Sequence, residues 1–137
     1  MRLFFGIFLA STANFFAGIL GFNIAKNSFI NSQAPTDFQS NLTLLSYFYS
    51  FFFKFLVILI LTWIMHRVIT MLDSPKKRIL FIFLLGSAFS IYSQIDIFWA
   101  DNYLAWSFIK VVGESLNWLM TGYILSKFVR PKHLGAL

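Results

Sequence analysis

The sequence predicts an all-α protein, an integral membrane four-helix bundle with both termini in the cytoplasm. Of the 137 residues, 58% are hydrophobic and only 12% are charged. A soluble domain usually carries about 25% charged residues, so this chain could not cover a surface that faces water. Four long apolar runs and a one-sided distribution of basic residues complete the prediction, and the length fits one domain over residues 1–137.

The four membrane spans are predicted at residues 3–25, 42–66, 79–97 and 103–129. For the first run a cleaved signal peptide is the alternative, because Ala10–Ala13 resembles a cleavage site. The apolar run continues through Phe22, however, and exceeds a signal-peptide core of about 7–15 residues. Ser74 followed by Pro75 predicts a helix start, with an N-cap and then a proline where no N–H is needed.

The orientation follows from the lysines and arginines. On the side of the termini and the second loop lie Arg2, Arg67, Lys76, Lys77, Arg78, Lys127, Arg130 and Lys132. Only Lys26 lies on the other side, where Asp37, Asp96 and Asp101 are also expected. Cytoplasmic loops carry an excess of basic residues, which places both termini in the cytoplasm. The net charge of +6 is therefore interpreted as a topology signal, and no nucleic-acid partner is expected.

The basic run Lys76, Lys77 and Arg78 is also expected to attract the headgroups of the lipid bilayer. Such attraction is worth about 1 kcal/mol for each charge near an anionic surface.

Several classes of chemistry are disfavoured. The chain has no cysteine, which excludes disulfides, thiolate metal sites and cysteine nucleophiles. Its two histidines, His66 and His133, lie near or beyond the cytoplasmic interface and lack the acid–histidine spacing of membrane hydrolases. No phosphate loop, nucleophile elbow or metal-ligand cluster is present in the sequence. The chain is predicted to be no enzyme and to hold no cofactor and no metal ion.

Small residues recur at every fourth position of the first run. One ridge is formed by Gly6, Ala10, Asn14 and Gly18, and the other by Ala13, Ala17, Gly21 and Ala25. Ridges of this kind let two helix backbones approach closely. They are expected either to pack inside the bundle or to contact a second copy or another membrane protein, and two ridges on adjacent faces could do both.

The last apolar run carries a polar stripe. Lys110, Glu114, Asn117 and Thr121 step by four, three and four residues, so they share one face of a helix. A charge inside a membrane is strongly unfavourable unless it has a partner or water, so this face is not expected to contact lipid. The other helices must supply its partners.

Charged and polar residues of three runs are predicted at a common depth. A rise of about 1.5 Å per residue places Asn14, Lys54 and Glu114 near the middle of a hydrocarbon core about 30 Å thick. Opposite charges at equal depth can offset each other. We therefore predict an interhelical ion pair between Lys54 and Glu114.

The remaining members of this polar layer are expected to complete its hydrogen bonds. They are Asn14, Asn117 and a serine of residues 79–97, either Ser87 or Ser90. The alternative pairs Glu114 with Lys110, four residues earlier on the same helix, and both pairs could form together.

Two functions suit such a layer. As a structural device, buried polar groups fix the order and register of helices, and the protein then acts through helix association as a subunit, or as a modulator or immunity-type blocker of another membrane protein. As a pathway, the same groups serve a small oligomeric proton- or cation-coupled transporter. The first is preferred because no proline interrupts a span and the two halves show no inverted repeat.

A spacing of glycines and large apolar residues marks the last run, at Phe108, Ile109, Gly113, Leu116, Leu119, Gly122, Ile124 and Leu125. Through these residues the chain from Phe81 onward resembles a family of small four-span bacterial inner-membrane proteins whose domain has no assigned function. The resemblance implies a fold and a bacterial setting but no activity. Lys54 and Glu114 are not part of it.

Overall fold

The computed structural model describes residues 2–28, 43–95 and 104–129. These form the helices α1 (Arg2–Ser28), α2 (Leu44–Arg67), α3 (Pro75–Tyr92) and α5 (Leu104–Phe128), and no strand occurs among them. The prediction of an all-α chain of four helices is confirmed. Asp37, Asp96, Asp101, Arg130, Lys132 and His133 lie outside the described ranges.

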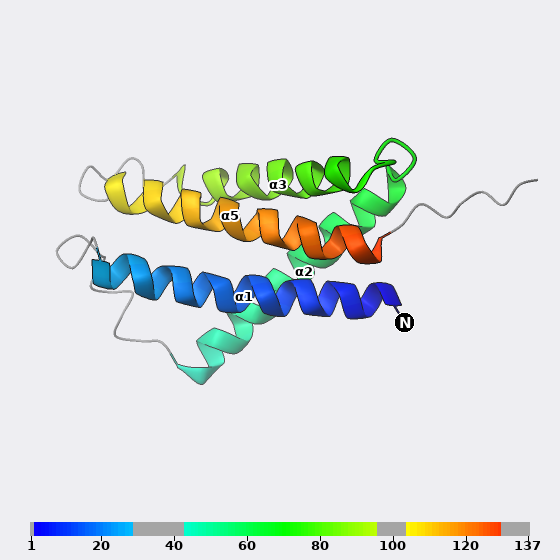
Figure 1. The fold of residues 1–137 in the computed structure, drawn as a ribbon. Coiled ribbons are helices and arrows are strands. Elements are labelled where there is room, and N and C mark those ends of the chain that lie inside the picture. Colours follow the sequence, from blue (N-terminus) through cyan, green and yellow to red (C-terminus); the bar gives the residue numbers. More distant parts are fainter. Residues whose placement is uncertain (1, 29–42, 96–103, 130–137) are drawn as a thin grey trace, which may run out of the picture.

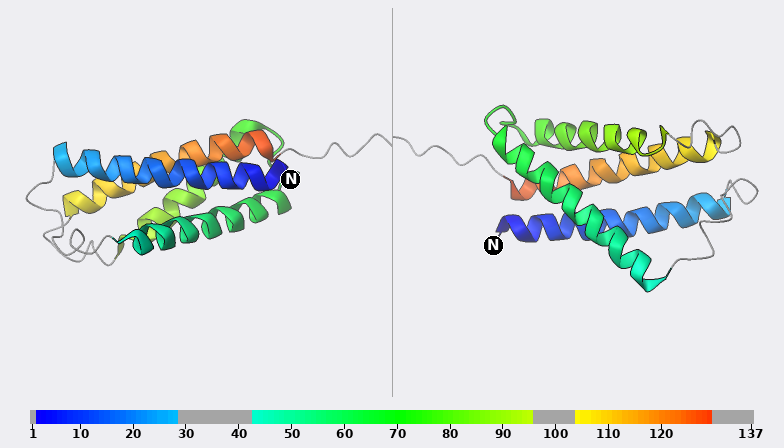
Figure 2. Two further views of the ribbon diagram at one scale, coloured as in Figure 1. Left: turned by 90° about the horizontal axis from the view of Figure 1, so that it is seen from below. Right: turned by 180° about the vertical axis from the view of Figure 1, so that it is seen from behind.

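Three helices lie side by side and the fourth crosses them (Figure 1). α5 lies between α1 and α3 and packs against both, which forms one layer. α2 crosses behind this layer at an angle, packs on α1 and meets α3 only near their shared loop (Figure 2). As a result, the half of α2 that begins at Leu44 diverges from α3.

The distribution of polar and apolar side chains is the reverse of that in a soluble domain. Among the described residues, the buried side chains comprise eight hydrophobic ones and nine polar or charged ones, so polar groups are not confined to the surface. Large apolar side chains such as Phe4, Phe53 and Trp63 are about 60% exposed or more. A water-soluble protein of this size would instead bury mainly apolar side chains and expose charged ones.

Two of the described helices, α1 over Arg2–Ile24 and α2 over Leu44–Arg67, are long and apolar enough to cross a membrane. Only 6% of the apolar window of α2 is buried, so α2 does not resemble the core helix of a soluble protein. α3 is less apolar because it begins with three basic residues, and α5 because it carries the polar stripe.

The start of α3 confirms the helix signal in the sequence. Ser74 is the N-cap, and its Oγ accepts a hydrogen bond of 3.3 Å from the backbone N–H of Lys77. Pro75 occupies the first helical position. The Lys77 ammonium lies 2.9 Å from the Asp73 carboxylate, and this hydrogen bond holds the pKa of Asp73 below its usual value. Both side chains are exposed, so solvent screens the pair.

Arg78 does not lie where the headgroup prediction placed it. Its side chain is buried, and its guanidinium donates to the carbonyls of Ser126 and Val129 at the end of α5 and to that of Ser74. The last carbonyls of a helix lack partners within the helix and carry partial negative charge, which the guanidinium compensates. The headgroup prediction is therefore wrong for Arg78, whereas Lys76 and Lys77 are exposed.

The two ridges of α1 have different environments. The first packs inside the bundle: a Cβ at Gly6 would lie 2.6 Å from Phe128, Ala10 is fully buried, and a Cβ at Gly18 would lie 2.8 Å from the Lys54 Nζ. The second is more open, since Ala13 and Ala17 are partly exposed and a Cβ at Gly21 would have no neighbour within 4 Å among the described residues. The side chain of Ala25 is outside the described set.

α3 and α5 approach closely at two glycines. A Cβ at Gly86 would lie 2.2 Å from the Trp118 ring, and a Cβ at Gly122 would lie 2.9 Å from the Ile79 carbonyl oxygen. Both distances are far below van der Waals contact. The absence of a side chain at these positions is therefore what permits the α3–α5 interface.

Candidate functional site

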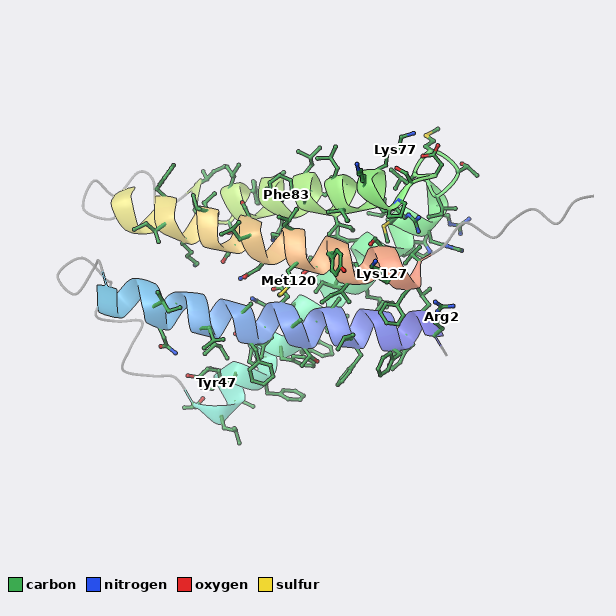
Figure 3. All side chains as sticks on the ribbon, viewed as in Figure 1. Arg2, Tyr47, Lys77, Phe83, Met120 and Lys127 are labelled. Atoms are coloured by element: carbon green, nitrogen blue, oxygen red, sulfur yellow. The ribbon has the colours of Figure 1, made fainter. Side chains whose placement is uncertain are left out.

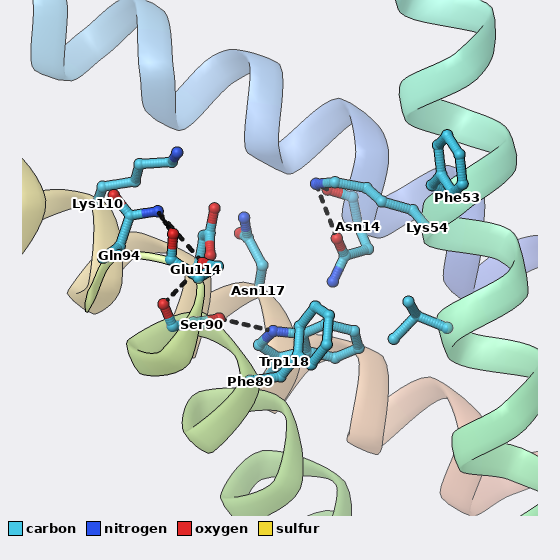
Figure 4. Close-up of a pocket in the computed structure, with 12 residues that line it drawn as sticks. Asn14, Phe53, Lys54, Phe89, Ser90, Gln94, Lys110, Glu114, Asn117 and Trp118 are labelled. Carbon is cyan, nitrogen blue, oxygen red and sulfur yellow. Dashed lines mark hydrogen bonds between the residues drawn. The ribbon is translucent and has the colours of Figure 1, made fainter. Parts of the chain in front are cut away.

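A cavity of about 490 Å³ lies between the four helices (Figure 4). It occupies the space that opens where α2 diverges from α3, in the half of the protein away from the α2–α3 loop. Its lining residues are Asn14 from α1; Phe53, Lys54 and Val57 from α2; Phe89 and Ser90 from α3, with Ser93 and Gln94 just beyond; and Lys110, Glu114, Asn117 and Trp118 from α5. The other half is filled by an apolar core that includes Met65, Ile82 and Leu125.

Asn14 connects three helices at the floor of this cavity. Its Oδ1 accepts a hydrogen bond of 3.1 Å from the Lys54 Nζ, and its Nδ2 donates one of 2.9 Å to the Thr121 Oγ1. Thr121 in turn donates to the backbone carbonyl of Asn117 over 2.8 Å. The missing side chain at Gly18 leaves the space in which the Lys54 ammonium lies. A single amide thus joins α1 to both α2 and α5.

Glu114 does not form the predicted ion pair. The Lys54 ammonium donates to Asn14 instead, and among the described residues the Glu114 carboxylate makes no hydrogen bond and no ion pair within 4 Å. The alternative pair with Lys110 is likewise not formed. Glu114 and Lys54 interact electrostatically across the cavity without contact. Lys54 on α2 and Glu114 on α5 line the same cavity, but they lie on separate walls of it.

The two serines proposed for the layer differ in position. Ser90 lines the cavity, donates to the carbonyl of Gly86 over 3.0 Å and accepts a 3.0 Å hydrogen bond from the Trp118 Nε1. Ser87 is not among the lining residues, and its buried Oγ has no hydrogen-bond partner among the residues that the structure describes. The cavity therefore brings together Asn14, Lys54, Ser90, Lys110, Glu114 and Asn117. Thr121 does not line it but accepts a hydrogen bond from Asn14.

The apolar part of the site was not predicted from the sequence. Phe53, Val57, Phe89 and Trp118 line the cavity alongside the polar groups. Trp118 follows Glu114 by four residues, so the helical spacing that defines the polar stripe also places its ring on that face. Phe53 and Phe89 occur in phenylalanine-rich helices, where nothing in the spacing distinguishes a lining ring from an exposed one.

The described lining of the site offers charged groups and hydrogen-bonding groups. Among residues 2–28, 43–95 and 104–129, no group of three or more His, Asp or Glu side chains is close enough to share a metal ion. The cavity instead combines two ammonium groups, one carboxylate, amides, hydroxyls and aromatic rings. Such a mixed lining is typical of a site that orients a small polar group beside an apolar one.

Comparisons with known proteins found no similar protein. No family model matches the sequence, and neither a curated protein nor a solved structure matches it.

Proposed function

We propose that the chain is a four-span protein of a bacterial inner membrane with both termini in the cytoplasm. α2 supports this proposal most directly, because it is long and strongly apolar and only 6% of its apolar window is buried inside the protein. Arg2, Lys77 and Lys127 lie at one end of the helices and Tyr47 lies at the other (Figure 3). The end with Arg2, Lys77 and Lys127 carries the basic residues expected of a cytoplasmic face.

Single cysteines test the topology, because the natural chain has none and each introduced thiol reports alone. In intact cells or right-side-out vesicles, a membrane-impermeant maleimide is expected to label Ser40→Cys, between α1 and α2. It is not expected to label Ser74→Cys, between α2 and α3, until the membrane is permeabilised. Labelling of Ser74→Cys in sealed vesicles would contradict the orientation.

Within this membrane, we propose a non-enzymatic role through helix association. The protein acts as a subunit, or as a modulator or immunity-type blocker of another membrane protein, and a second copy of the chain is the other possible partner. The partly exposed ridge of Ala13, Ala17 and Gly21 supports this role, since small residues on the surface of a helix admit another helix closely. Large exposed side chains at Phe16 and Leu20 flank the ridge and provide contact area.

Photo-crosslinking tests this association. A benzoyl-phenylalanine at Phe16, beside the ridge, is expected to give a discrete protein adduct in native membranes, and Gly21→Leu should abolish it by filling the ridge. Phe108 on α5 is similarly exposed and is the matched control, expected to give no discrete adduct. An adduct of twice the 15.9 kDa chain identifies a second copy, and another mass identifies a different protein. Equal adducts at both positions, or none at Phe16, would contradict the proposed surface.

A small cation- or proton-coupled transporter is the second candidate. It is supported by Lys54, Lys110 and Glu114 around one cavity, since ionisable groups inside a membrane often mark a pathway. Against it, Ile58, Met65 and Leu125 belong to an apolar core on the cytoplasmic side of the cavity. Ion-coupled uptake into liposomes that is lost in Glu114→Gln would favour the transporter.

A further inference from the structure

The cavity has two walls of opposite charge. Lys54 projects from α2 and is held against α1, whereas Glu114 projects from α5 (Figure 4). We propose that this cavity binds a zwitterion, a molecule or headgroup that carries an ammonium group and a carboxylate or phosphate group. The site differs from the exposed α1 ridge, so this proposal does not depend on helix association.

The Lys54 wall is suited to the anionic group. An ammonium group has three N–H donors. Among the described residues, Lys54 donates hydrogen bonds to one residue, at the side-chain oxygen and the more distant backbone carbonyl of Asn14. These contacts fix the position of the ammonium group without neutralising it, because an amide carries no net charge. An incoming carboxylate or phosphate would form a charge-assisted hydrogen bond there.

The Glu114 wall is suited to the ammonium group. The carboxylate can accept hydrogen bonds on both oxygens, yet it has no hydrogen-bond partner among the described residues. It lies in a half-buried position beside the cavity, where an unpaired carboxylate is unfavourable. A ligand ammonium group would supply both a charge and N–H donors.

The charges on both walls select against singly charged ligands. A simple anion would meet the Glu114 carboxylate, and a simple cation would meet the Lys54 and Lys110 ammonium groups. A zwitterion satisfies both walls at once. Phe89 and Trp118 add apolar surface for a carbon skeleton or the start of an acyl chain.

The size fits one ligand of this kind, because small-molecule sites usually enclose about 300–1,000 Å³. Two sources share the required chemistry: the ethanolamine phosphate headgroup of a membrane lipid and a free amino acid or phosphoethanolamine in solution. Under the proposed topology the cavity extends from the middle of the membrane, at Asn14, Lys54 and Glu114, toward its outer side, at Gln94 and Lys110.

Binding to the purified full-length protein in detergent tests the proposal. The probes are lysophosphatidylethanolamine, lysophosphatidylglycerol as an anionic lipid without the ammonium group, free phosphoethanolamine and free glycine. The variants are Glu114→Gln and Lys54→Met, with the exposed Lys76→Met as control. Affinity is followed by tryptophan fluorescence, because Trp118 lines the cavity, and by the shift in thermal midpoint.

We expect at least tenfold tighter binding of lysophosphatidylethanolamine than of lysophosphatidylglycerol, and at least a tenfold loss in Glu114→Gln with Lys76→Met unchanged. Glu114→Gln should also abolish the preference between the two lipids, an effect that general destabilisation would not produce. Binding of free phosphoethanolamine or glycine with the same Glu114 dependence assigns a solute, and its absence assigns a lipid headgroup. Equal binding of both lipids together with no binding of the free zwitterions, or unchanged affinities in Glu114→Gln, would overturn the proposal.

Discussion

Replacing Asn14 with leucine is expected to lower the free energy of unfolding by about 3 kcal/mol. It removes the side-chain oxygen that accepts from the half-buried Lys54 ammonium group and the amide N–H that donates to Thr121. Asn14 is the only described residue to which the Lys54 Nζ donates a hydrogen bond, and it also donates to Thr121. A leucine of similar size would preserve packing and remove both interactions. The measurement is the thermal midpoint in detergent or nanodiscs.

A double-mutant cycle separates this cause from a packing defect. Lys54→Met removes the ammonium group, so the Asn14 side-chain oxygen no longer accepts a hydrogen bond from a charged donor. In that background Asn14→Leu should lose most of its effect. Asn23→Leu is the matched control, since Asn23 is an exposed asparagine on the same helix. Additive effects of Asn14→Leu and Lys54→Met would show that the hydrogen bond contributes little to stability.

Gly86→Ala is expected to destabilise the protein by about 1–3 kcal/mol, the usual range for overpacking a well-packed interior. The added Cβ would lie 2.2 Å from the Trp118 ring and 2.8 Å from the Trp118 Cβ, so a change of side-chain rotamer alone cannot relieve the clash. Movement of the ring would also break its hydrogen bond to Ser90. The thermal midpoint and the tryptophan emission maximum report the two effects.

The same substitution at open glycines gives the control for Gly86→Ala. A Cβ at Gly21 or Gly113 would meet nothing within 4 Å, so Gly→Ala there should be neutral or stabilising by up to about 1 kcal/mol through helix propensity. Combining Gly86→Ala with Trp118→Ala should cost less than the sum of the two single changes. Equal midpoints for Gly86→Ala and Gly113→Ala would refute the tight α3–α5 contact.

Periodicity predicted the polar stripe of α5 but could not assign its partners. The step of four, three and four residues places Lys110, Glu114 and Asn117 on one face, and all three line the cavity. Counting residues gives the height of a side chain along its helix but not the direction in which the helix faces its neighbours. Lys54 and Glu114 were matched by height alone. α2 crosses the layer at an angle, so Lys54 reaches Asn14 first.

Features that depend on residues within one helical turn could be predicted from the sequence. Ser74 and Pro75 act within one turn, and the sequence identified the start of α3 from them. Arg78 shows the opposite case, because nothing in three adjacent basic residues indicates which one turns inward. Its position depends on where α5 ends, a segment 48 to 51 residues away in the chain. The tight fit of Gly86 to Trp118 depends in the same way on the register of two helices.

The contact between Arg78 and the end of α5 has a consequence for biogenesis. On the proposed topology, α1 and α2 are the helices that insert most favourably on their own. α3 inserts less favourably because of its basic start, and α5 because of its polar stripe. Until α5 is synthesised, Arg78 lacks the carbonyls of Ser126 and Val129 that it binds in the finished protein. α3 and α5 should therefore enter the bilayer together as a helical hairpin, after α1 and α2 have already integrated.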